Sequence, residues 1–315
     1  MAKTDYQQIA RDIIGFLNKV KTESPDNVMT MFFVQKPSRE KYVSFRPQIS
    51  NEIQKKILSM ILGPAIKSLG FTVVPYNAVG VADEENELLI PSTVQCLNIF
   101  MESIEDDKIY KEMDKLDISK IGFYCTRISY KGKSVYLFRQ FSKMNKLRNS
   151  FMGEFYDDEL REMDSDFLGI DTLTDIVYDP DYEILLVLNH ISLERIFNYR
   201  DEFLNIANAA IIDIVDQGIM HNVEQFADDC RRDVRILKRF TEMMSKDRLP
   251  LFFEHYEKVP EIVKELELDI DFDEDGKIIY RERSQLFHII NLMSDAYFRS
   301  LLADRLGIAK TEDTL

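Results

Sequence analysis

The stretch "GFYCTRISYKGKSVYLFRQF", residues 122–141, carries the strongest β-hairpin pattern in the chain. Two runs rich in β-branched and aromatic residues flank a short tip that contains Gly132. Apolar side chains occupy both faces of the second run, with Val135, Leu137 and Phe141 on one face and Tyr136 and Phe138 on the other. A strand that is apolar on both faces is typical of the centre of a sheet. We therefore expect a buried central hairpin in which Arg139 is partly buried beside a carboxylate partner.

Helical and strand patterns on either side of this hairpin divide the chain into two halves. In the first half, the helical period predicts helices over 3–22, over 50–62 and over most of 92–116. The second of these helices has Ser50 as N-cap and ends at Gly63-Pro64. Strand patterns cover 27–36, 41–46 and 71–77, and a second hairpin is predicted over 172–189. After Asn189 the helical period dominates. We predict an α+β fold: a mixed sheet-and-helix domain, residues 1–190, with the basic hairpin at its centre, then a mostly helical domain, residues 191–315, with a β-hairpin near 268–280.

Charge is strongly segregated along the sequence. The formal net charge is −15, yet residues 120–153 contain eight Lys and Arg and no acid, and residues 154–183 contain twelve acids against Arg161 alone. Five cations at the hairpin tip or after its second strand are candidates for binding DNA phosphates: Lys131, Lys133, Lys143, Lys146 and Arg148. The alternatives are a solubilising surface, or neutralisation by the acidic segment of the same chain. In the second case, DNA would bind only after the acidic segment is displaced.

A second basic feature is "CRRDVRILKRF", residues 230–240. Its spacing predicts one exposed helix face that carries Arg231, Arg232, Arg235, Lys238 and Arg239, opposite a buried apolar side. Such a face can cross a phosphate backbone. The alternative is a solvated face whose cations pair with nearby acids: Asp228, Asp229, Asp233 and Glu242.

Composition limits the class of protein. The chain has 315 residues, of which 45% are hydrophobic, so it can form a substantial core. No apolar run approaches the ~20 residues that cross a bilayer, which indicates a soluble protein. The three cysteines, Cys96, Cys125 and Cys230, lie far apart, as expected of free thiols in a reducing cytosol. The acidic balance argues against a generic nucleic-acid coat, but a local basic site still acts over a Debye length, ~8–10 Å.

One segment matches a calcium-binding loop and also a hairpin. "DFDEDGKIIYRE", residues 271–282, fits the pattern D-x-D-x-D-G-x₅-E. However, apolar residues alternate at Leu268, Ile270 and Phe272 before an Asp-Gly turn, which is a strand pattern, whereas an EF-hand needs a helix up to the loop. We predict the hairpin, and no metal site.

Residues that could carry out catalysis do not cluster in the sequence. The four histidines are isolated: His190, His221, His255 and His288. No glycine-rich phosphate loop or nucleophile elbow occurs. Asp179, Asp181 and Glu183 could suggest a metal-dependent nuclease, but the strand that follows them offers no nearby lysine, and turn chemistry accounts for Asp-Pro-Asp. We therefore predict no catalytic residues, no cofactor and no enzymatic activity.

Three passages resemble the KwaB family, the cytosolic component of the Kiwa anti-phage defence system. They are "SVYLFRQFSKMNKL", "EILLVLNHISLERIFNYRDEFLNIAN" and "DIDFDEDGKIIYRERSQLFHIINLMSDAYFRSLL", and the resemblance spans most of residues 118–304. It implies a bacterial, cytoplasmic protein that forms a homodimer or larger oligomer. It also implies recruitment to the inner membrane by a small multi-span partner, KwaA, and binding to DNA that hinders phage replication or expression.

Charge layout and resemblance together predict a DNA-binding effector that acts without catalysis. The competing hypotheses are a protein–protein adaptor of a membrane sensor that does not bind nucleic acid, and a metal-dependent nuclease. The adaptor hypothesis assigns the basic surfaces to an acidic protein or an anionic lipid.

Overall fold

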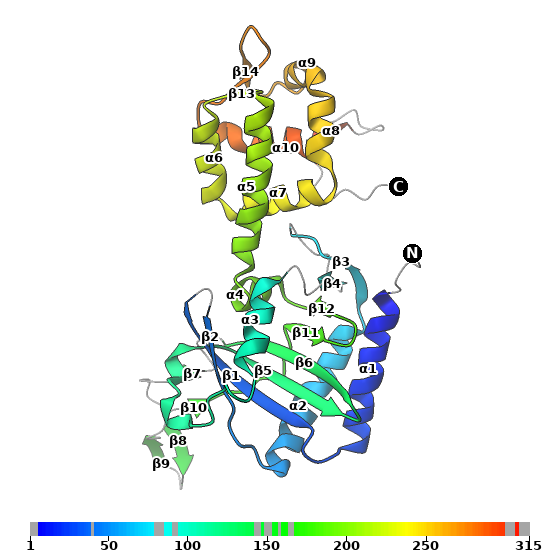
Figure 1. The fold of residues 1–315 in the computed structure, drawn as a ribbon, viewed down its shortest axis with the longest axis vertical. Coiled ribbons are helices and arrows are strands. Elements are labelled where there is room, and N and C mark those ends of the chain that lie inside the picture. The colour runs from blue at the N-terminus through cyan, green and yellow to red at the C-terminus, as the bar shows by residue number, and fades with distance from the viewer. Residues whose placement is uncertain are drawn as a thin grey trace. The chain divides into compact units, whose positions relative to one another are not determined.

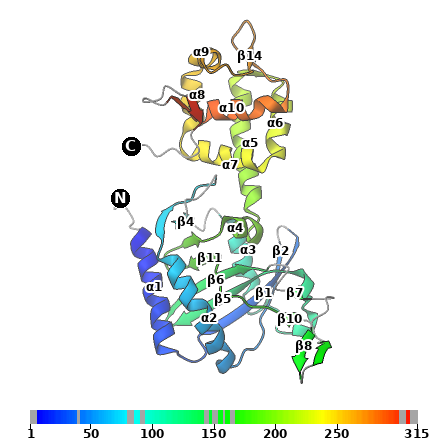
Figure 2. The same ribbon diagram turned by 180° about the vertical axis from the view of Figure 1, so that it is seen from behind.

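The computed structural model describes residues 6–38, 41–78, 85–89, 94–141, 146–147, 153–156, 159–162, 167–299 and 306–308. The chain forms two units, drawn in Figures 1 and 2. The first unit comprises residues 1–76 and 81–199, and the second comprises residues 77–80 and 200–315. The first contains a large sheet and the second is mainly helical, so the predicted α+β fold is confirmed.

The first unit contains the following elements in chain order: α1 (Tyr6–Glu23), β1 (Met29–Ser38), β2 (Lys41–Phe45), α2 (Asn51–Leu69), β3 (Thr72–Pro75), β4 (Glu85–Leu89), α3 (Gln95–Ser103), η2 (Met113–Lys115), η3 (Ile118–Lys120), β5 (Ile121–Tyr130), β6 (Lys133–Gln140), β7 (Lys146–Leu147), β8 (Gly153–Tyr156), β9 (Glu159–Glu162), β10 (Phe167–Leu168), β11 (Ile176–Asp179), β12 (Ile184–Val187) and α4 (His190–Ile196). Eight of these strands form one sheet in the order β2-β1-β5-β6-β11-β12-β4-β3.

The predicted hairpin of β5 and β6 lies at the centre of this sheet. Its register runs from Phe123 opposite Gln140 to Tyr130 opposite Lys133. The two tip residues, Lys131 and Gly132, have φ of 50° and 83°. A two-residue turn with two positive φ angles matches the right-handed twist of the strands that it joins. The second predicted hairpin is also present, as β11 and β12.

Both faces of β6 are buried, as its apolar pattern predicts. Helices α1 and α2 lie side by side along one face of the sheet (Figure 1), where Val135, Leu137 and Phe141 join their core. Phe138 lies on the other face, in an aromatic cluster with Phe123, Phe100 of α3 and Phe197, which follows α4.

Arg139 joins the basic block of the sequence to the acidic block. Its guanidinium donates to both carboxylate oxygens of Asp171 at 2.7–3.0 Å and to Asp175 Oδ1 at 2.7 Å. Its side chain is 16% exposed, and that of Asp175 is 2% exposed. The expected carboxylate partner is thus confirmed, and Asp175 Oδ2 also accepts from the backbone N–H of Gln140 at 2.8 Å.

Two predicted helices have other bounds in the structure. The helix that begins at the Ser50 cap does not end at Gly63-Pro64 but continues to Leu69. An internal proline costs about 3 kcal/mol, but Ala65 and Leu69 beyond it are buried in the core, which offsets this cost. Within 94–116, α3 ends at Ser103, and Tyr110 instead forms an isolated β-bridge with Phe45. Residues 92 and 93 lie outside the described residues.

The second unit contains α5 (Tyr199–Gln217), whose first residue belongs to the first unit, followed by β13 (Met220–His221), α6 (Val223–Arg232), α7 (Val234–Ser245), α8 (Arg248–Glu254), η5 (Tyr256–Lys258), α9 (Val259–Glu265), β14 (Asp271–Phe272), β15 (Ile278–Ile279), η6 (Arg283–Gln285), α10 (Leu286–Met293), β16 (Tyr297–Arg299) and β17 (Leu306–Ile308). Its core includes Phe226, Phe240, Tyr280, Ile290 and Met293.

The segment with the calcium-loop pattern is a hairpin, as predicted. Strands β14 and β15 are antiparallel, and α9 ends at Glu265. Asp273 Oδ1 accepts from the backbone N–H groups of Asp275 and Lys277, while its Oδ2 lies 2.6 Å from His221 Nε2. This carboxylate therefore stabilises the turn. The hydrogen bond with His221, together with those from the turn backbone, lowers the pKa of Asp273.

Within the part of the chain that the structure describes, no helix is long and apolar enough to cross a membrane.

Replacement of Arg139 by alanine should lower the free energy of unfolding by about 3–5 kcal/mol, because it leaves the buried Asp175 carboxylate without its cation. The matched control is Lys131→Ala, which removes a solvent-exposed ion pair with Glu23 and should therefore lower the free energy of unfolding much less than Arg139→Ala. Urea denaturation followed by circular dichroism compares the two. Equal, small losses would contradict a structural role for Arg139.

Candidate nucleic-acid interface

The cations of the basic hairpin face acidic partners in the first unit. Lys131 Nζ lies 3.1 Å from Glu23 Oε2, and Lys133 Nζ lies 2.8 Å from Asp179 Oδ2. Asp179 is fully buried and Lys133 is largely buried. Lys143, Arg148 and the side chain of Lys146 lie outside the described residues. The described part of the hairpin therefore directs its cations mainly to carboxylates of the same chain.

The position of Lys133 contradicts one reason given above against a nuclease, namely that no lysine lies near Asp179, Asp181 and Glu183. Pairing of β6 with β11 brings this lysine against Asp179, although no lysine is near Asp179 in the sequence. The other two carboxylates, Asp181 and Glu183, are exposed in the turn between β11 and β12. Among the described residues, no three metal-ligating side chains gather at one point.

The second basic segment forms two helices, so the prediction of one continuous helix face is wrong. Helix α6 ends at Arg232 and α7 begins at Val234, with Asp233 between them in an extended conformation. The Asp233 side chain accepts from the backbone N–H of Arg235 at 3.0 Å and caps α7. Aspartate is a favoured N-cap because its side chain satisfies an N–H group that has no partner within the helix. The break separates Arg231 and Arg232 from the three later cations.

The later cations line a groove of about 790 Å³ in the second unit, between α7 and the segment formed by η6 and α10. We call it the α7–α10 groove. Its lining comprises Asp233, Arg235, Ile236, Lys238, Arg239, Arg283, Leu286 and Phe287. Four cations thus face one carboxylate, in a chain whose net charge is negative. Arg283 and Phe287 were missed by sequence reasoning, because only the fold brings η6 and α10 beside α7.

Asp233 holds two of the groove arginines. Arg235 Nε and Nη2 lie 3.2 and 3.0 Å from its two carboxylate oxygens, and Arg283 Nη2 lies 3.1 Å from Oδ2. The side chains of Arg235 and Arg283 are 89% and 56% exposed. The hydrogen bond from the Arg235 side chain, with other bonds to the same carboxylate, lowers the pKa of Asp233 to about 2. Asp233 therefore stays ionised at neutral pH, and its arginines keep exposed donor groups.

Arg239 is oriented by two different contacts. Its Nη1 donates to Oδ1 of the buried Asn291 at 2.9 Å, and its guanidinium lies 5.0 Å from the centre of the Phe287 ring. The neighbouring Lys238 has its Nζ 5.5 Å from the Phe203 ring centre. Guanidinium groups stack on aromatic rings by cation–π attraction, so Arg239 is held at the wall of the groove.

Arg231 and Arg232 do not line the groove. Arg231 donates to Asn208 Oδ1 at 2.9 Å and to Asp228 Oδ1 at 3.2 Å. Arg232 lies 3.7 Å from Asp229. For these two residues the structure agrees with the alternative of local pairing with acids.

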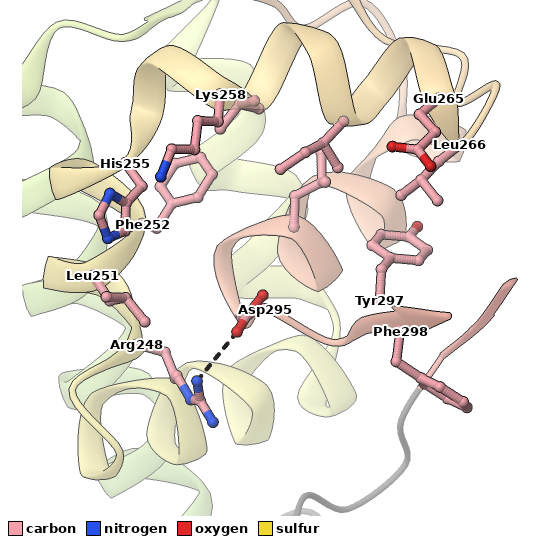
Figure 3. Close-up of a pocket in the computed structure, with 13 residues that line it drawn as sticks. Arg248, Leu251, Phe252, His255, Lys258, Glu265, Leu266, Asp295, Tyr297 and Phe298 are labelled. Atoms are coloured by element: carbon pink, nitrogen blue, oxygen red, sulfur yellow. Dashed lines mark hydrogen bonds and ion pairs between the residues drawn. The ribbon is translucent and has the colours of Figure 1, made fainter. Parts of the chain in front are cut away.

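A smaller, mostly apolar pocket of about 380 Å³ lies elsewhere in the second unit, between α8, α9, the end of α10 and β16. Figure 3 shows the ion pair of Arg248 with Asp295, at 3.2 Å, on one side of this pocket and Tyr297 and Glu265 on the other. The described lining carries two cations, Arg248 and Lys258, and two carboxylates, Glu265 and Asp295, so its formal charges cancel and it lacks the positive excess of the α7–α10 groove.

The family model described as Kiwa protein KwaB-like matches residues 118–303, which is more than half of the chain and includes the basic hairpin and every residue of the α7–α10 groove. No curated protein and no solved structure matches the chain.

Proposed function

The chain belongs to the Kiwa protein KwaB-like family and is therefore a component of Kiwa anti-phage defence; from this premise we propose that it binds DNA through the α7–α10 groove. The observation that carries the proposal is the convergence of Arg235, Lys238, Arg239 and Arg283 on one groove, in which Asp233 is the one carboxylate among the described lining residues. Cations that contact phosphates release condensed counterions, and this release favours binding.

The overall negative charge of the protein does not oppose this proposal at short range. In ordinary salt, exposed charges farther away than about 8–10 Å are largely screened. A phosphate within the groove therefore interacts mainly with the charges of the groove and with acids directly beside it, such as Glu282 next to Arg283, and only weakly with distant acids. The same screening makes binding depend steeply on salt.

We propose that the effect on the phage is non-catalytic, as a protein that occupies DNA and blocks replication or expression. Family membership places the chain in a Kiwa system with partner proteins. The proposal has three further parts. They are the membrane protein KwaA as a partner, recruitment from the cytoplasm to the inner membrane, and self-association as a homodimer or larger oligomer.

The nuclease hypothesis is checked by incubating DNA with the protein and Mg²⁺ or Mn²⁺. Cleavage of the DNA would contradict the non-catalytic part of the proposal and support a nuclease instead.

The double substitution Arg235→Gln and Arg283→Gln should weaken DNA binding and reduce its dependence on salt. If each arginine contacts one phosphate, the slope of log K against log salt concentration should become less negative by about 1.8 with a duplex probe and by about 1.4 with a single-stranded probe. Fluorescence anisotropy at several salt concentrations measures this slope. The matched control, Arg231→Gln with Arg232→Gln, removes the same charge outside the groove and should change the slope much less. An equal effect of the two pairs would contradict the assignment.

Replacement of Asp233 by asparagine should strengthen DNA binding. The change removes the carboxylate that the described lining residues place in the groove and releases two arginines, while asparagine caps a helix as well as aspartate does. If the lost repulsion is about 1 kcal/mol, the affinity should rise roughly fivefold.

Asp228→Asn provides the control for this experiment, because it removes one charge from the exposed pair with Arg231. Because the pKa of Asp233 is about 2, the advantage of Asp233→Asn should stay constant from roughly pH 6 to pH 8. An Asp233→Asn protein that binds DNA no better than the Asp228→Asn protein would refute the role given to this carboxylate.

A further inference from the structure

Phe287 is an exposed aromatic residue at the start of α10. The residues of this helix that face the core, Leu286, Ile289, Ile290 and Met293, are buried, whereas Phe287 projects outward and is 44% exposed. A single exposed apolar residue is ordinary on a protein surface. Phe287 differs because it lines the α7–α10 groove, where the other exposed side chains are cationic.

The Phe287 ring is held from one side. The guanidinium of Arg239 lies over it at 5.0 Å from the ring centre. Arg239 is fixed in turn by the hydrogen bond to Asn291, which is buried and lies four residues after Phe287 on the same helix. Arg239 thus covers part of the ring, and the rest of it remains open to the groove. A ring that is already oriented loses little side-chain freedom when a second flat group stacks on it.

A cationic groove with an open aromatic ring fits a particular form of nucleic acid. Bases within a duplex are stacked on each other and cannot cover a protein ring unless the duplex is opened, whereas the bases of a single strand can stack on it. Lys and Arg along such a groove follow the backbone phosphates, and stacking on the aromatic side chain tolerates any base.

From this geometry we propose that the α7–α10 groove binds single-stranded nucleic acid, with one base stacked on Phe287 and the flanking phosphates contacted by Arg235, Lys238 and Arg283. The inference rests on the proposed DNA binding and adds the form of the ligand. Single-stranded DNA is exposed wherever a phage genome is replicated or transcribed, so a protein with this preference would act on DNA in use.

The test compares the full-length parent protein with Phe287→Leu and Phe287→Trp. Leucine keeps an apolar side chain but has no aromatic face, and tryptophan keeps the face. The probes are a fluorescein-labelled oligothymidylate of about 15 nucleotides, the same strand in a duplex, and the same backbone without bases. Fluorescence anisotropy gives the affinity for each probe, and thermal melting verifies that each variant is folded.

Phe287→Leu should bind the single strand about tenfold more weakly than the parent, while its affinity for the duplex changes by less than about twofold. Phe287→Trp should bind the single strand as well as the parent. The parent should bind the backbone without bases as weakly as Phe287→Leu binds the single strand.

Failure of this inference can be told apart from failure of the proposed function. In one outcome, the parent binds DNA and the double variant Arg235→Gln/Arg283→Gln binds it more weakly, but Phe287→Leu has no effect on any probe. The groove then binds DNA without base stacking, and only this inference is overturned. A parent that binds polyglutamate but neither form of DNA would overturn both, and would support an acidic protein partner instead.

Discussion

The ion pair between Arg139 and its two carboxylates is the contact on which the first unit depends. Arg139 comes from β6, and Asp171 and Asp175 come from the segment that leads into β11. Asp175 also donates its backbone N–H to the carbonyl oxygen of Phe138, and its own carbonyl accepts from Leu188 and Asn189. One residue therefore joins β6, β11 and the chain that enters α4. Because Asp175 is buried, its charge is tolerated only while Arg139 is present.

This contact also explains the segregated charge of the sequence. The positive block and the negative block that follows it are partly folded onto each other by the pairing of β6 with β11. Arg139 and Lys133 are both bound by acids of the later block, and Lys131 is bound by Glu23 of α1. Among the described residues, much of the positive charge of the hairpin is thus used to stabilise the fold. The hypothesis that residues 154–183 shield a DNA-binding block remains a prediction, because most of the charged side chains involved lie outside the described part.

In the second unit, by contrast, part of the positive charge remains exposed to solvent. In the α7–α10 groove, Asp233 is shared by two arginines whose side chains stay exposed, and Arg239 is held against Phe287. Four cations around one carboxylate leave a local excess of positive charge, although the chain as a whole is acidic. Local fields, rather than net charge, determine what a groove attracts at physiological salt. The exposed ring then adds a contact that charge alone does not supply.

The sequence by itself determined the central hairpin, the burial of both faces of β6, the α+β class, the hairpin at Asp271–Ile279 and the family. These follow from local periodicity, turn residues and motif order, which are properties of neighbouring residues. The sequence did not predict the continuation of α2 through Pro64, the break at Asp233, or the arrival of Lys133 at Asp179. Only the tertiary structure decided which cations are bound by acids and which line a groove with Arg283 and Phe287. The physical reason is that ion pairs and grooves depend on distances of a few ångströms between segments far apart in the chain, and packing alone fixes those distances.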